Sequence, residues 1–160
     1  MELQTGITRD IYPMPAFVTL EVSDVHRTVA WYEALGFISL FTLPGPDGDP
    51  MLVHLRRWRY QDVLVRPGTP APAGGQSLSI AGVADELDAM AERVREHSHR
   101  TGTGSVEGPA DTPWNTRDLR LTDPDGYSLV VTARRPEGTR DAAFEQHIRD
   151  LAAEQLGSGS

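Results

Sequence analysis

Residues 17–37, FVTLEVSDVHRTVAWYEALGF, have the pattern of a strand followed by the helix that covers it. Apolar and more polar side chains alternate over residues 18–22, as in a strand with one buried face. Asp24 stands where a helix N-cap belongs, and apolar residues recur after it at helical spacing. Gly36 can adopt the left-handed conformation that commonly ends a helix. The stretch therefore predicts a βα unit.

The same outline recurs later in the chain. Residues 77–80, SLSI, alternate like a strand, and residues 85–98, DELDAMAERVREHS, have a helical apolar stripe. Each copy precedes three more strand-like segments, and DPDG at 123–126 predicts a tight turn before the last of them. We therefore expect an α+β fold of two βαβββ modules, forming a curved, cup-like mixed sheet with the helices outside. Chemistry or binding should occur in the cleft between the curved sheets.

Changes in composition divide the chain into five segments. The stretch PGTPAPAGGQ, rich in Pro and Gly, cannot sustain a strand or helix and predicts a linker. The C-terminal tail has an apolar stripe that would cap either the domain or a partner subunit. The predicted segments are a lead-in (1–13), the first module (14–66), the linker (67–76), the second module (77–135) and a helical tail (136–160).

Composition excludes several classes of function. The chain of 160 residues has no cysteine, which rules out disulfides, thiolate metal sites and a cysteine nucleophile and fits a cytoplasmic protein. A net charge of −8 argues against nucleic-acid binding and favours a neutral or cationic small molecule. No apolar stretch approaches the roughly 20 residues of a membrane span, so we expect no membrane partner.

Three sequence motifs carry a resemblance to a known family. VTLEVSD, WYEALGF and PWNTRDLRLTDPDG occur in this order, and together they resemble the vicinal oxygen chelate superfamily. This superfamily includes glyoxalase I, extradiol dioxygenases, fosfomycin-resistance enzymes and bleomycin-resistance proteins. The resemblance covers roughly residues 14–134 and implies the two-module fold expected above. One such scaffold hosts many chemistries, so function must be argued from the site.

The resemblance also implies where a metal would bind. Members of this superfamily hold a divalent cation through His, Glu or Gln on the first and last strands of each module. The matching positions here are Phe17, Leu64, Ser77 and Val130. They offer one hydroxyl, whereas a divalent cation needs three or four converging N or O ligands. We therefore predict no metal and no other cofactor.

Without metal ligands the predicted cleft is apolar, which favours a hydrophobic or aromatic small molecule. Indole rings near such a cleft can stack on planar ligands. Trp58 and Trp114 are as well explained by loop packing, and His54 by an ordinary polar strand position. The predicted ligand-binding residues are Phe17, Thr19, Phe41, His54, Trp58, Leu64, Ser77, Trp114, Asn115, Arg120 and Val130.

Three functions remain open at this point, and one of them is a ligand-free scaffold or sensor subunit. The chain is similar in character to metal-free bleomycin-resistance-type proteins, which implies a homodimer that sequesters an antibiotic or natural product and needs no catalytic residue. The alternative is a cofactorless biosynthetic enzyme, an isomerase, cyclase or lyase, in which His54 with Asp62 or Glu21 supplies acid–base catalysis. Glu21 would also pair with Arg120 or Arg56 if buried.

Overall fold

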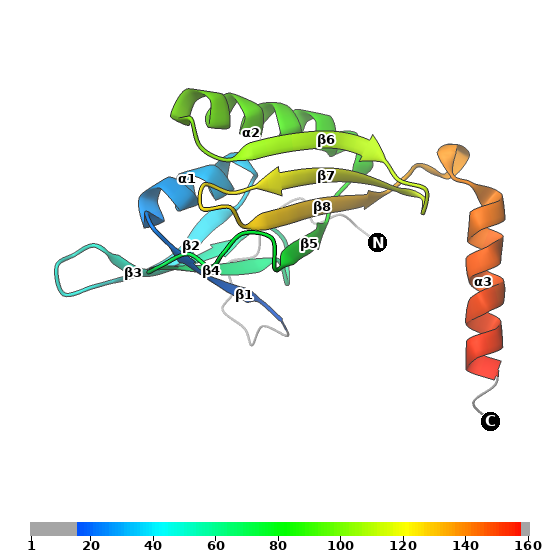
Figure 1. Ribbon diagram of the computed structural model, residues 1–160, viewed down its shortest axis with the longest axis horizontal. Coiled ribbons are helices and arrows are strands. Elements are labelled where there is room, and N and C mark those ends of the chain that lie inside the picture. Colours follow the sequence, from blue (N-terminus) through cyan, green and yellow to red (C-terminus); the bar gives the residue numbers. More distant parts are fainter. Residues whose placement is uncertain (1–15, 158–160) are drawn as a thin grey trace.

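The computed structural model describes residues 16–157, and the predicted lead-in at 1–13 lies outside this range. Two four-stranded mixed sheets form the body of the molecule (Figure 1). In each sheet the module's first strand pairs in parallel with its last, and the other neighbours are antiparallel. The first sheet has the order β1 (Val18–Val22), β4 (Asp62–Pro67), β3 (Pro50–Arg56) and β2 (Ile38–Pro44). The second has the order β5 (Ser77–Ala81), β8 (Ser128–Arg134), β7 (Thr116–Thr122) and β6 (Ser105–Asp111).

One helix follows the first strand of each module, which confirms the α+β fold with a repeated βαβββ order. Helix α1 (Val25–Ala34) lies between β1 and β2, and α2 (Leu87–Thr101) follows the short turn η1 (Ala84–Glu86) after β5. A second short turn, η2 (Glu137–Thr139), leads from β8 into α3 (Ala142–Gly157). None of the helices in residues 16–157 combines the length and apolar character that a membrane span requires.

The ends of α1 form as its sequence predicts. The side chain of Asp24 accepts a hydrogen bond from the backbone N–H of Arg27 at 2.9 Å, which satisfies one of the free donors of the first turn. Gly36 has a φ of 103°, a conformation that a side chain would strain. The chain can therefore reverse into β2 directly after the helix.

The two modules share one hydrophobic core, in which α1 and α2 pack against each other; both helices lie on the left of Figure 1. The indole of Trp31 is fully buried, stacks edge-on against Tyr32 at 5.1 Å and donates to Ser98 Oγ on α2 at 3.3 Å. Buried aromatic rings of this size contribute strongly to core stability. Trp31 thus joins two elements of the same chain.

Helix α2 extends beyond its predicted end. The helix predicted over residues 85–98 continues to Thr101 and ends at Gly102, which has a left-handed φ of 67°. His97 is buried against the core, and burial lowers its pKa, with the charge of Arg100 adding to the effect.

Helix α3 extends away from the two sheets (Figure 1), and none of its residues is buried. Its base is attached to the second module by the Asn115 side chain, which donates to the carbonyl of Asp141 at 3.0 Å and accepts from its N–H at 2.7 Å. Arg134 on β8 adds an ion pair to Glu145 at 3.1 Å. Only the first turn of the helix is therefore joined to the body by these contacts.

Candidate functional site

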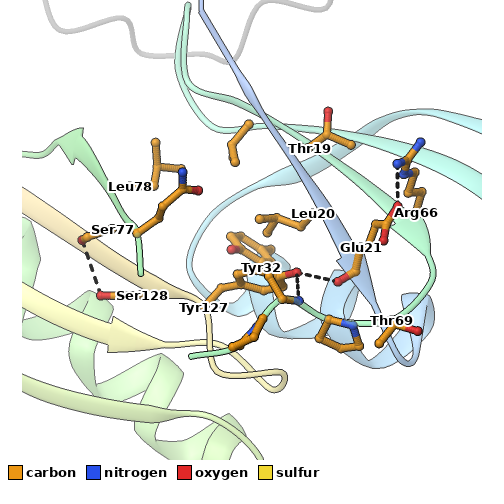
Figure 2. Close-up of a pocket in the computed structure, with 15 residues that line it drawn as sticks. Thr19, Leu20, Glu21, Tyr32, Arg66, Thr69, Ser77, Leu78, Tyr127 and Ser128 are labelled. Atoms are coloured by element: carbon orange, nitrogen blue, oxygen red, sulfur yellow. Dashed lines mark hydrogen bonds and ion pairs between the residues drawn. The ribbon is translucent and has the colours of Figure 1, made fainter. Parts of the chain in front are cut away.

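A pocket of about 780 Å³ lies at the junction of the modules, between the sheet-edge strands β1 and β5. Both modules and the linker supply its walls (Figure 2). Its volume falls within the range of small-molecule sites. Its polar lining comes from Thr19, Glu21, Tyr32, Arg66, Thr69, Gln76, Ser77, Tyr127 and Ser128.

Hydrogen bonds hold the walls of this junction pocket together. Tyr127, just before β8, donates through its hydroxyl to the carbonyl of Glu21 on β1 at 2.8 Å and accepts from the N–H of Ala71 in the linker at 2.9 Å (Figure 2). Glu21 in turn forms an ion pair with Arg66 at 2.5 Å. One phenol thus connects both modules and the linker. The expected pairing of Glu21 with Arg120 or Arg56 is wrong, because Arg66 lies opposite it in the β1–β4 register.

Beneath the pocket, Tyr32 meets a buried carboxylate. Its hydroxyl lies 3.5 Å from Asp123 Oδ2, while the other oxygen of Asp123 accepts from the N–H groups of Asp125 and Tyr127 at 2.9 and 3.0 Å. Burial raises the pKa of Asp123 from 3.8 to about 6, although these backbone bonds oppose the shift. Burial, followed by the charge of Asp123, raises the pKa of Tyr32 well above its usual value. The pKa of Asp123, at the module junction, therefore lies well above that of an ordinary carboxyl group.

The far face of the first sheet, meaning the face away from α1, carries a row of predicted ligand-binding residues. Alternation places these residues opposite the core-facing side chains of the same strands. Phe41 is 47% exposed, so the row presents an aromatic surface beside a histidine. Strand pairing joins the row in the order Thr19, Leu64, His54 and Phe41.

His54 in this row belongs to a buried charged group. Its Nε2 lies 2.6 Å from Asp62 Oδ1, and Arg56 Nε donates to the same oxygen at 2.7 Å. The side chains of Asp62 and Arg56 are fully buried. A neutral imidazole here donates Nε2–H to the carboxylate and presents Nδ1 as an acceptor. Of the two carboxylates considered for His54, the structure brings Asp62 to it.

The far face of the second sheet, meaning the face away from α2, is more polar than the far face of the first. Its central row is Ser79, Val130, Arg120 and Glu107, with Val130 buried. Arg120 and the exposed Trp114 line one pocket of about 230 Å³, together with Asp118. Sequence reasoning missed Asp118, although its alternation with Arg120 along β7 places both on the same face.

The remaining predicted residues lie elsewhere. Phe17 is 50% exposed and lines a separate pocket of about 460 Å³ at the junction. Trp58 lies in the turn between β3 and β4, half-buried, with the guanidinium of Arg57 stacked 4.2 Å from its ring centre. Asn115 is buried and binds the backbone at the base of α3. The structure thus brings Thr19 and Ser77 together at the junction pocket, and Trp114 and Arg120 at the second sheet.

The residues at the implied metal positions do not fit a metal. Leu64 and Val130 occupy equivalent places, opposite Thr19 and Ser79 on the first strands of the two modules. Hydrocarbon side chains cannot ligate a cation, and Phe17 adds no donor. Within residues 16–157, no three His, Asp or Glu side chains converge as a metal site would require.

Comparison with known proteins identifies a family. Residues 15–131 match the model of the Glyoxalase/Bleomycin resistance protein/Dioxygenase superfamily. The chain is similar to TnmS3, an antibiotic-binding protein from Streptomyces sp. CB03234, with 25% identity, a TM-score of 0.56 and coverage of 74% of this chain and 93% of that one. It also shares the fold of FosX, a fosfomycin-resistance protein from Listeria monocytogenes complexed with Mn(II) and sulfate, with 13% identity, a TM-score of 0.59 and coverage of 79% and 97%. No curated protein sequence matches the chain.

Proposed function

This chain belongs to the Glyoxalase/Bleomycin resistance protein/Dioxygenase superfamily, and we propose that it is a metal-independent binding protein that confers resistance by sequestering an antibiotic or related natural product. Its structural relatives include antibiotic-binding and fosfomycin-resistance proteins. The absence of cysteine fits action in the cytoplasm, where we place this function.

The single observation that carries the proposal is the apolar replacement at the metal positions. Leu64 and Val130, at equivalent places in the two sheets, cannot bind a cation, but they can pack against a hydrophobic ligand. Phe41 extends this apolar surface across the first sheet, beside His54. Ligands held by such surfaces depend on contact area and stacking, with few polar contacts setting their orientation.

We further propose that the protein acts as a homodimer. Phe41 and Leu43 are 47% and 37% exposed and lie two residues apart on β2, near the far face of the first sheet. Exposed apolar groups gathered in this way mark interaction sites more often than ordinary surface. A second copy laid over this face would cover these groups and enclose the ligand between the two subunits.

Calorimetric titration with a panel of planar polycyclic antibiotics and their uncharged aglycones tests the proposal. We expect at least one compound to bind at one equivalent per subunit or per cleft, and mass spectrometry to recover that compound unchanged. Phe41→Ala should weaken its binding about tenfold, whereas Leu156→Ala, at an exposed position on α3, should leave it unaltered. Equal affinity in both variants would rule out binding at the far face.

The contact between His54 and Asp62 favours a second candidate, a cofactorless isomerase, cyclase or lyase. A carboxylate-oriented imidazole with Nδ1 available is suited to proton transfer at the far face. In that case a bound compound would be converted, and new product would accumulate beyond one equivalent. His54→Gln would then abolish conversion while retaining most of the affinity, and an unchanged rate in this variant would exclude the imidazole as the base.

A further inference from the structure

One carboxylate oxygen of Asp118, on β7, accepts hydrogen bonds, whereas the other accepts none within residues 16–157. Its Oδ1 accepts two hydroxyl hydrogen bonds, from Thr116 at 2.9 Å and from Thr132 at 2.7 Å. Its Oδ2 accepts none from any residue within 16–157, and the nearest cation, Arg120 Nη2, lies 3.9 Å away. The Asp118 side chain is only 10% exposed. The Oδ2 oxygen keeps contact with solvent, so the N–H donor of a ligand can reach it.

This Oδ2 oxygen belongs to a small pocket with an aromatic wall. Asp118, Glu107 and Trp114 all line the cavity of about 230 Å³ on the second sheet, and the indole of Trp114 is 52% exposed. This volume is below the usual range for a whole drug-sized ligand, so the pocket suits one substituent of a larger molecule. An indole beside carboxylates provides a cation–π surface and ionic acceptors together.

The charges around this pocket favour a cation. Asp111 at the rim already pairs with Arg117 at 3.2 Å and with Arg135 at 3.4 Å. Two further carboxylates, Glu107 and Asp118, have one arginine, Arg120, as their neighbour. Arg120 lies opposite Glu107 in the strand pairing, its side chain is 55% exposed, and its 3.9 Å separation from Asp118 exceeds hydrogen-bond distance. A net charge of −8 on the chain adds a long-range attraction for cations.

We propose that this pocket binds an organic ammonium group, with the N–H donors on Asp118 Oδ2 and the adjoining apolar or aromatic part against Trp114. The inference deepens the proposed function and rests on it, because it assigns an amine substituent to the sequestered compound. Arg120 competes with the ammonium group for the same oxygen. Removing Arg120 should therefore strengthen binding, an outcome that a purely structural role for this residue does not predict.

The probes are 2-phenylethylamine and its uncharged analogue 2-phenylethanol, titrated into the full-length protein at pH 7 and followed by NMR or calorimetry. We expect the amine to bind at least tenfold more tightly than the alcohol. Asp118→Asn should remove this preference, because the amide keeps an acceptor for the two threonine hydroxyls but loses the charge. Arg120→Gln should tighten amine binding severalfold, and Trp114→Leu should weaken it. Glu96→Gln, on the exposed face of α2, is the matched control for lost charge and should change nothing.

Equal affinity for amine and alcohol, or an unchanged preference in Asp118→Asn, would overturn the inference. Melting curves of each variant verify folding, and Arg120→Gln provides an independent test because its side chain is largely exposed. The two proposals fail separately. Binding of an uncharged polycyclic aglycone without any amine preference would reject only the amine subsite, whereas amine binding without uptake of any polycyclic compound would reject sequestration.

Discussion

The hydroxyl of Tyr127 in the second module donates to the backbone carbonyl of Glu21 in the first, at 2.8 Å, and holds the linker through Ala71. This hydroxyl makes two hydrogen bonds in a partly buried position. Tyr127→Phe should therefore lower the free energy of unfolding by about 1–3 kcal/mol. Urea unfolding measures the change. Ser128→Ala at the same junction loses only a long contact to Ser77, at 3.4 Å, and should cost well under 1 kcal/mol. Equal losses in both variants would contradict the role of the phenol.

The raised pKa of Asp123, about 6, predicts a dependence of stability on pH. The native state binds this proton more tightly than the unfolded state, so the buried carboxyl contributes no penalty below about pH 4. As the pH rises through 6 the native state must ionise it, which lowers the free energy of unfolding by up to about 3 kcal/mol.

Asp123→Asn should remove this penalty while its amide oxygen still accepts from Asp125 and Tyr127. The variant should therefore gain stability relative to the wild type between pH 4 and pH 7. Urea unfolding at a series of pH values measures the difference. Parallel profiles for the two proteins would show that Asp123 titrates normally.

Two glycines with the same backbone conformation provide a matched pair. Gly102 and Gly104 have φ values of 67° and 73°, so an alanine at either position carries left-handed strain of about 1 kcal/mol. A Cβ at Gly102 meets nothing within 4 Å, whereas one at Gly104 would collide with Trp31 Nε1 and lie 3.0 Å from the carbonyl of Thr122. Gly104→Ala should therefore destabilise the protein by about 3 kcal/mol or more, and Gly102→Ala by about 1 kcal/mol. Thermal melts compare the two, and similar melting temperatures would refute close packing under Trp31.

Chelation tests the proposed independence from metal. Because Leu64 and Val130 cannot ligate a cation, EDTA should change neither the melting temperature nor the affinity for a bound compound. Elemental analysis of the purified protein should find metal far below one equivalent. A stoichiometric divalent ion, or a lower melting temperature after chelation, would contradict the proposal.

The homodimer predicts that a charge on the far face separates the subunits. Phe41→Lys places an ammonium group within the proposed interface, and the mass in solution, measured by light scattering, should fall to that of the monomer. Since Phe41 is 47% exposed, the fold itself should lose little stability. Leu156→Lys, at the end of α3, is the control and should leave the mass unchanged. A wild-type protein that is monomeric at all concentrations would refute the dimer.

Much of the fold could be predicted because the chain follows local rules. Asp24 and Gly36 mark the two ends of α1, and strict alternation identifies β1. The prediction was wrong where tertiary packing decides the outcome. Helix α2 continues past His97 because that side chain packs into the core, which compensates for the weak helix propensity of the segment.

The candidate site was less predictable, because alternation gives the face of a residue but not what covers it. Alternation along β3 places Arg56 on the far face together with His54, yet its side chain is fully buried with that of Asp62. Glu21 pairs with Arg66 because the β1–β4 register aligns them, and this register cannot be obtained from either strand alone. The special conformation of Asn115, with a φ of 65°, and its bonds to Asp141 depend on a helix that begins well after it in the chain.

The shared core implies that neither half of this protein is self-sufficient. Trp31 and Tyr32 on α1 contact Ser98 and Asp123 of the other half, so a chain cut within residues 67–76 would expose these rings in the first fragment and the core-facing side chains of α2 in the second. Each fragment alone should collapse without a unique structure, whereas mixing them should restore the native fluorescence of the buried indole. The two halves therefore depend on each other to fold, and the linker keeps both of them in one chain.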